Sequence, residues 1–140
     1  MYSDNNEEID NFYCDFCIKD DKITKLITSK EDNYIRIYDF HKGYLIDKIV
    51  VKNNVVGLCF LENDIIIAGC VNNMLLVDTK NKIILKGLVG HENAPRIIKK
   101  IDDKFGEFLI SGCFNKIIIW KITCEMLEYI NEIKYSNIFI

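Results

Sequence analysis

Three segments of the 140-residue sequence repeat one pattern, and this repetition constrains the fold more than any other feature. The segments are residues 26–39, 66–78 and 109–121. Each has an apolar pair, a pair of small residues, a polar turn and a mostly apolar run. The small pairs and the ends of the runs are Thr28-Ser29 with Tyr38, Ala68-Gly69 with Val77, and Ser111-Gly112 with Trp120. The run ends are 39 (38 to 77) and 43 (77 to 120) residues apart, a period typical of solenoids and propellers.

The apolar stretches within and between these repeats are short. Polar turn sequences separate them, such as Glu-Asn-Asp at 62–64 and Asn-Asn at 72–73. Short strands at this spacing predict an all-β sandwich, barrel or propeller. The runs Ile65–Ala68 and Ile117–Trp120 are apolar at consecutive positions. They predict inner strands with both faces covered by neighbouring sheets.

The third repeat carries residues found in a known repeat family. His91 follows a glycine and lies 29 residues before Trp120, and the Ser-Gly pair at Ser111 lies between them. The WD40 repeat is about 40–45 residues long, with a Gly-His near its start and a Trp-Asp near its end. Over about residues 12–133 the chain therefore resembles the WD40 family.

The other repeats match this family less closely. The first has Asp32 in its turn and Tyr38-Asp39 at its end but no Gly-His, and the second keeps Asp78. The third has Lys121 where the family has its final Asp. Three aligned copies at the right period carry the resemblance, because each motif alone is weak.

The resemblance implies a partial β-propeller of about three four-stranded antiparallel WD40-like blades. Residues 1–11 would be an acidic lead-in, and residues 12–140 the repeat domain. We place the repeats at about 12–51, 52–88 and 89–133, and expect 134–140 to be an edge strand or the start of a further blade. Closed propellers have four to eight blades. We therefore expect this chain to be part of a larger propeller, or to be completed by a partner or by self-association.

In this family a His, a Ser or Thr, an Asp and the Trp form a buried hydrogen-bond network within one blade. Carried onto the third repeat, the resemblance implies a structural network of His91, Ser111, Asn115 and Trp120. Asn115 replaces the family's Asp, so the network lacks a charge-assisted hydrogen bond. The resemblance also implies a partner-binding rim built from the turns before the Trp strand and the loop after the Gly-His. The rim residues are Glu31, Asp32, Val71, Asn72, Phe114, Pro95 and Arg96.

The sequence favours no metal, cofactor or catalytic site. Cys14 and Cys17 form one C-x-x-C pair, but structural zinc needs four ligands, and residues three apart on a strand point to opposite faces. A nucleophile and base pair of Cys113 with His91 is a weaker alternative. We expect that chemistry to fail if the two side chains lie on opposite sides of a sheet. The expectation is a protein that is not an enzyme and that binds no cofactor.

The charge of the chain favours protein partners over nucleic acid. The net charge is −3, whereas a nucleic-acid binder normally shows a basic face. Residues 1–18 hold five acids and no base. No apolar run approaches the roughly 20 residues of a membrane span, so we expect a cytoplasmic or nuclear protein. The predicted function is a protein-interaction scaffold; the alternative is a small closed β-barrel or sandwich that binds a peptide or ligand.

Overall fold

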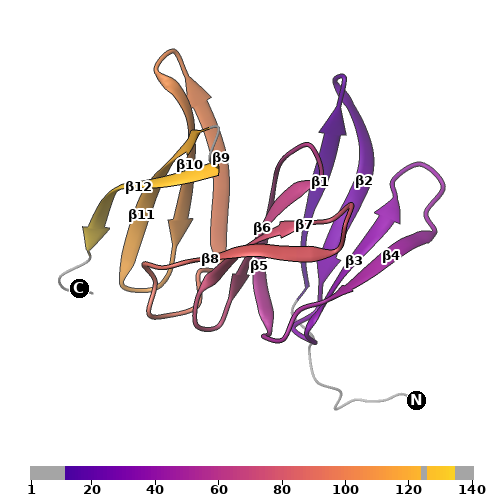
Figure 1. Ribbon diagram of the computed structural model, residues 1–140, viewed down its shortest axis with the longest axis horizontal. Helices are drawn as coiled ribbons and strands as arrows, with labels where there is room; N and C mark the ends of the chain where they lie inside the picture. The colour runs from indigo at the N-terminus through magenta and orange to yellow at the C-terminus, as the bar shows by residue number, and fades with distance from the viewer. Residues whose placement is uncertain (1–11, 124–125, 135–140) are drawn as a thin grey trace, which may run out of the picture.

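The computed structural model describes residues 12–123 and 126–134. Over these residues the chain forms strands grouped in three four-stranded antiparallel sheets (Figure 1). The first sheet is β1 (Tyr13–Lys19), β2 (Lys22–Ser29), β3 (Tyr34–Asp39) and β4 (Leu45–Val50). The second sheet is β5 (Val55–Glu62), β6 (Ile65–Cys70), β7 (Met74–Asp78) and β8 (Ile83–Leu88). The third sheet is β9 (Ile97–Asp103), β10 (Gly106–Gly112), β11 (Lys116–Thr123) and β12 (Met126–Lys134).

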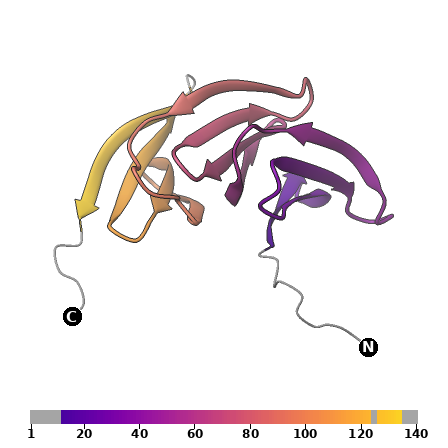
Figure 2. The ribbon, with the colours of Figure 1, turned by 90° about the horizontal axis from the view of Figure 1, so that it is seen from below.

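The strands of each sheet follow one another in sequence order, and the sheets stand side by side in an arc (Figure 2). The first strands β1, β5 and β9 contact one another between sheets, while β4, β8 and β12 lie along the convex side. The fold is therefore all-β and propeller-like, as predicted. Three separate sheets in an arc are not a closed barrel or a two-sheet sandwich. None of the described residues forms a helix long and apolar enough to span a membrane.

Two hairpins show how the polar turn sequences set the strand pairing. Asp20 and Asp21 join β1 to β2, and Asn63 and Asp64 join β5 to β6. All four residues have positive φ, between 51° and 66°. Two-residue turns with positive φ at both positions match the twist of antiparallel strands, and Asp and Asn tolerate this conformation well.

Apolar side chains fill the space between the sheets in two layers. Between the first and second sheets, Ile27 and Ile35 pack in one cluster with Ile66. Between the second and third sheets, Ile67 lies in a cluster with Leu109 and Ile118, and all three side chains are fully buried. All six residues of β6 are buried because the second sheet is covered on both faces. The sequence prediction for the run from Ile65 is thus confirmed.

The third sheet differs from the prediction, because only one of its faces is covered. Ile118 and Trp120 of β11 are buried against the second sheet, whereas Ile117 and Ile119 are only half-buried. No sheet of the described chain lies beyond this opposite side (Figure 2). Strand pairing puts several apolar residues and two lysines on it, and we call it the free face of the third sheet. Its residues are Ile97, Lys99, Ile101, Phe108, Ile110, Gly112, Ile117, Ile119 and Lys121.

Polar contacts also tie neighbouring sheets together near their first strands. The backbone N–H of Phe60 in β5 donates to Asp15 Oδ2 in β1 over 2.7 Å. Lys100 Nζ in β9 donates to the backbone oxygen of Leu61 over 3.0 Å. Each contact pairs a charged side chain with a backbone group, a stronger interaction than one between neutral groups. They fix the position of each sheet against the next.

Candidate functional site

The third sheet contains a buried hydrogen-bond network on its covered face. His91 Nε2 lies 2.7 Å from Ser111 Oγ, and Trp120 Nε1 donates to the same oxygen over 2.8 Å. All three side chains are buried. The loop after β8 supplies His91, β10 supplies Ser111 and β11 supplies Trp120. The structure thus brings together three of the four residues that the WD40 resemblance placed in this network.

The fourth residue, Asn115, is linked to His91 through a cysteine. Cys113 Sγ donates to Asn115 Oδ1 over 2.9 Å and lies 3.3 Å from His91 Nδ1. When the thiol donates its one proton to Asn115, the contact with Nδ1 is donated by the imidazole. In this assignment of the protons, His91 carries its proton on Nδ1, and Nε2 accepts from the hydroxyl of Ser111. Each group in the chain from Trp120 to Asn115 then donates a hydrogen bond to the next group. Hydrogen bonds arranged in this way strengthen one another.

The surroundings of the His91 imidazole favour its neutral form. Burial lowers the pKa of His91, and the nearby charge of Lys116 lowers it further. A neutral His91 with its proton directed at Cys113 cannot take the proton of that thiol. The two side chains lie on one side of the sheet and in contact, so the geometric test set for a Cys–His pair does not remove that alternative. The proton positions nevertheless suit a structural relay.

Two of the predicted rim residues, Arg96 and Glu31, are joined by a hydrogen-bond chain that links the third sheet to the first. Arg96 Nη1 donates to Tyr13 Oη over 2.6 Å, and that hydroxyl donates to Glu31 Oε2 over 2.8 Å. Arg96 also lies 3.9 Å from the Glu31 carboxylate. The pKa of Tyr13 is raised, first by burial and then by its bond to Glu31. Sequence reasoning placed Arg96 and Glu31 on one rim but missed Tyr13, which links them.

Of the other predicted rim residues, one is hydrogen-bonded within its own sheet and three are exposed to solvent. Asp32 accepts two hydrogen bonds from Arg36, at 2.6 and 3.2 Å, which lower the pKa of its carboxyl. Val71 and Asn72 are exposed in the turn between β6 and β7, and Phe114 is 79% exposed in the turn between β10 and β11. Phe114 thus does not pack back on its own sheet.

Pro95 departs from the predicted rim, because it is buried. A β-carbon built on Gly69 would lie 2.4 Å from the Pro95 carbonyl oxygen, and one on Gly57 would lie 2.8 Å from it. Only glycine permits this approach of two backbones. Pro95 therefore anchors its loop to the second sheet and is not presented to a partner.

Beside Phe114 the free face of the third sheet is hollowed into a groove of about 530 Å³. Its lining is mainly apolar and includes Ile97, Ile110 and Ile117 from three adjacent strands. Cys113 and Arg96 lie at its rim end. Apolar contacts combined with an Arg and an aromatic residue are typical of protein-binding surfaces.

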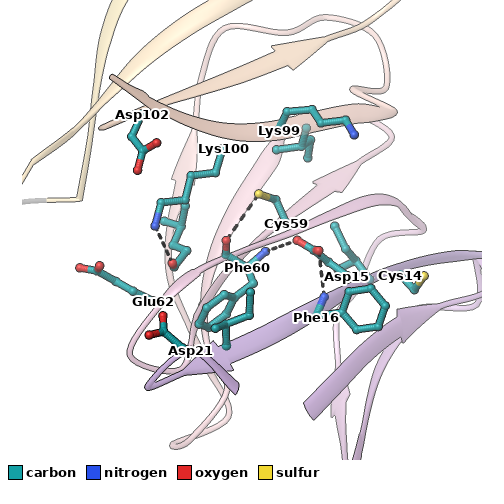
Figure 3. Close-up of a pocket in the computed structure, with 14 residues that line it drawn as sticks. Cys14, Asp15, Phe16, Asp21, Cys59, Phe60, Glu62, Lys99, Lys100 and Asp102 are labelled. Carbon is teal, nitrogen blue, oxygen red and sulfur yellow. Dashed lines mark hydrogen bonds between the residues drawn. The ribbon is translucent and has the colours of Figure 1, made fainter. Parts of the chain in front are cut away.

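A second cleft, of about 720 Å³, lies between the first strands of the three sheets (Figure 3). Asp21, Glu62 and Asp102 line it together with Lys100. Burial raises the pKa of Cys59, on its wall, to about 12. Sequence reasoning missed this cleft because its lining comes from strands far apart in the sequence. The shared position of β1, β5 and β9 as first strands was the signal that could have located it.

The cysteine pair of β1 lies as its spacing predicts. Cys14 is exposed and Cys17 is buried between the sheets, on opposite faces of the strand. Burial raises the pKa of Cys17 to about 11. Within the described residues, no group of three or more His, Cys, Asp or Glu side chains is placed to hold a metal ion.

Comparison with known proteins supports the fold and assigns no family. No protein-family model matches the sequence, and no curated protein does. Among solved structures, the chain is similar to the computationally designed Ika8 protein, with a TM-score of 0.60 and 19% identity. The match covers 82% of this chain and 34% of the designed one, so this chain spans about a third of that protein's length. The chain therefore has the fold of part of a propeller-like protein.

Proposed function

We propose that this chain is a non-catalytic protein-interaction module of WD40 type, which binds other protein chains through the sheets at the ends of its arc. The observation that supports this best is the free face of the third sheet. Ile97 is 60% exposed on it, and Ile110, Ile117 and Ile119 are only half-buried. A contiguous apolar patch of this kind marks an interaction site.

The contacts of the Cys113–His91 pair favour a structural role over a catalytic one. A cysteine nucleophile needs a base that accepts its proton. With the thiol proton assigned to Asn115, the His91 proton points to sulfur, and this assignment supports the non-catalytic role. His91 also forms a hydrogen bond with Ser111, which accepts one from Trp120. These buried polar groups therefore have hydrogen-bond partners, as a structural role requires.

Cross-linking in cells would test the proposal. The chain would be tagged, treated with a lysine-specific cross-linker and purified for mass spectrometry. Lys99 and Lys121 lie on the free face, whereas Lys86 lies on β8 at the convex side. We expect cross-links from partner proteins to concentrate on Lys99 and Lys121 and to be few at Lys86.

A pair of variants supplies the control. Ile97→Lys places a charge on the free face, and Ile83→Lys does so on β8, where the side chain is also half exposed. We expect Ile97→Lys to reduce capture of the cross-linked partners about tenfold and Ile83→Lys to leave it unchanged. Equal capture by both variants and by the unmodified chain would refute the proposed function.

A further inference from the structure

A small residue near the end of the second strand of each sheet receives the chain that leads into the next sheet. In the first sheet Ser29 Oγ donates to the carbonyl oxygen of Val55 over 3.1 Å. In the second sheet Gly69 holds the equivalent place, and the carbonyl oxygen of Pro95 lies against it. We call this small residue the seat of its sheet. In strand register, the seat of the second sheet pairs with Gly57, which lies two residues after Val55. The seat of the third sheet pairs with Ile97, which lies two residues after Pro95. The two sheet contacts therefore share one geometry.

Gly112 is the third member of this series and lies on the free face of the third sheet. Strand pairing aligns it with Ser29 and Gly69. A β-carbon at Gly112 would meet only Ile117 Cγ1, at 3.8 Å. The apolar groove of about 530 Å³ opens in front of it. The third sheet thus has the seat that its neighbours use, with open space where they hold a following sheet.

Register also identifies which residue of a following sheet faces the seat. Ile98 Cδ1 lies 3.0 Å from a β-carbon built on Gly69. Ile98 pairs with Ser111, just as Leu58 pairs with Ala68. Both Leu58 and Ile98 are buried against the preceding sheet.

In the first sheet this position belongs to Cys14. It pairs with Thr28, the residue that aligns with Ala68 and Ser111. Cys14 is exposed, because no sheet of the described chain precedes the first one (Figure 2). One end of the arc therefore presents the seat, and the other end presents the residue that fits it.

We propose that the free face of the third sheet binds the first sheet of a second copy of this chain, head to tail, with Cys14 of one copy against Gly112 of the next. This inference rests on the proposed function and names its partner. Head-to-tail contacts of one surface with a different one close into rings when the rotation permits. Two copies supply six sheets, which lies within the four to eight blades of closed propellers.

The two surfaces have matching chemistry. Phe16 and Leu45 are exposed on the outer face of the first sheet, as Ile97 and Ile101 are on the free face of the third. The free face also carries the positive charges of Lys99 and Lys121.

Two basic residues on the outer face of the first sheet, Arg36 and Lys48, have partners within that sheet. Arg36 is neutralised by Asp32, and Lys48 lies over the ring of Tyr34.

Chemical cross-linking of the purified chain tests the contact. A β-carbon on Gly57 would lie 3.4 Å from Ile98 Cδ1, and Ile97 holds the Gly57 position in the third sheet. The variant Ile97→Cys, which is smaller than the native residue, should therefore bring its thiol close to Cys14 of another copy. We expect a short bismaleimide to join two chains, and the added change Cys14→Ser to abolish the product. Cross-linking that survives Cys14→Ser would overturn the proposed orientation.

Mass measurement tests the seat itself. By light scattering we expect the unmodified chain at about twice its 16.4 kDa mass, and Gly112→Val at the mass of one chain. Gly87→Val is the matched control, because Gly87 lies on exposed β8 with its nearest neighbour atom 3.5 Å from a β-carbon. A chain that is monomeric at high micromolar concentration would overturn this inference. The proposed function would still stand if partner proteins then cross-linked to Lys99 and Lys121.

Discussion

The variant Ser111→Ala would test the buried network directly. Ser111 Oγ is fully buried and bonds both His91 Nε2 and Trp120 Nε1. Alanine keeps the strand conformation but removes the oxygen, so that the indole N–H and the imidazole nitrogen lose their common partner. Both of these groups are buried where water does not replace the oxygen.

The expected loss follows from the two groups left without a partner. Each buried polar group without a hydrogen bond costs about 1–3 kcal/mol. Two such groups, with partial relaxation, lower the free energy of unfolding by about 3 kcal/mol. A domain of this size has a total stability of about 5–15 kcal/mol. At about 3–4 °C per kcal/mol, the melting temperature should fall by roughly 10 °C.

Urea unfolding monitored by tryptophan fluorescence would measure this loss, because Trp120 is the one tryptophan of the sequence. Thr28→Val is the matched control at the same position of the first sheet. Thr28 is 1% exposed, and its hydroxyl has no hydrogen-bond partner. Valine removes an unsatisfied group of similar size, so we expect equal stability or a gain of about 1 kcal/mol. A loss for Ser111→Ala below about 0.5 kcal/mol, the range of ordinary surface changes, would refute the network argument.

Three further outcomes follow from the same geometry. Because the pKa of His91 is lowered in the folded state, the free energy of unfolding should fall as the pH drops below about 6.5. In the variant His91→Gln, the urea unfolding midpoint should change less between pH 7 and pH 5 than in the unmodified chain. An equal change in both proteins would contradict this. Asn115→Asp gives Cys113 an ionised acceptor, so thermal unfolding at pH 7 should show a gain of about 1 kcal/mol, and a loss would argue against this hydrogen bond. Burial raises the pKa of Cys59 to about 12, so mass spectrometry after maleimide treatment at pH 7.5 should find it labelled in urea but not in the native protein.

The repeat pattern allowed the architecture to be predicted because periodicity is a local signal. Small pairs such as Ala68-Gly69 and Ser111-Gly112 lie at the end of the second strand of each sheet or one residue before it, and the polar turns follow. The Glu-Asn-Asp sequence at 62–64 likewise predicted a turn, in which Asn63 and Asp64 take the positive-φ conformation that these residues tolerate. Such features depend on neighbours in the chain, and a single sequence displays them.

Features that depend on distant residues could not be predicted. Tyr13 bonds Arg96 across 83 positions of sequence, and no local pattern marks either residue as the other's partner. Pro95 read as an exposed loop residue, but the glycines that bury it lie on another sheet. The run from Ile117 is apolar at every position, so the sequence did not distinguish a covered face from a free one.

The position of the network within the arc has a physical explanation. The second sheet is covered on both faces and all of β6 is buried, and its Ala68, which takes the place of Ser111, has no side-chain hydrogen bond to offer. The third sheet is covered on one face only, so less apolar surface is removed from water there. Its hydrogen bonds to Ser111 offset part of this difference and fix Trp120 against the second sheet. In the proposed function, a binding partner on the free face would supply the remaining burial, and the groove in front of Gly112 is the place proposed for that contact.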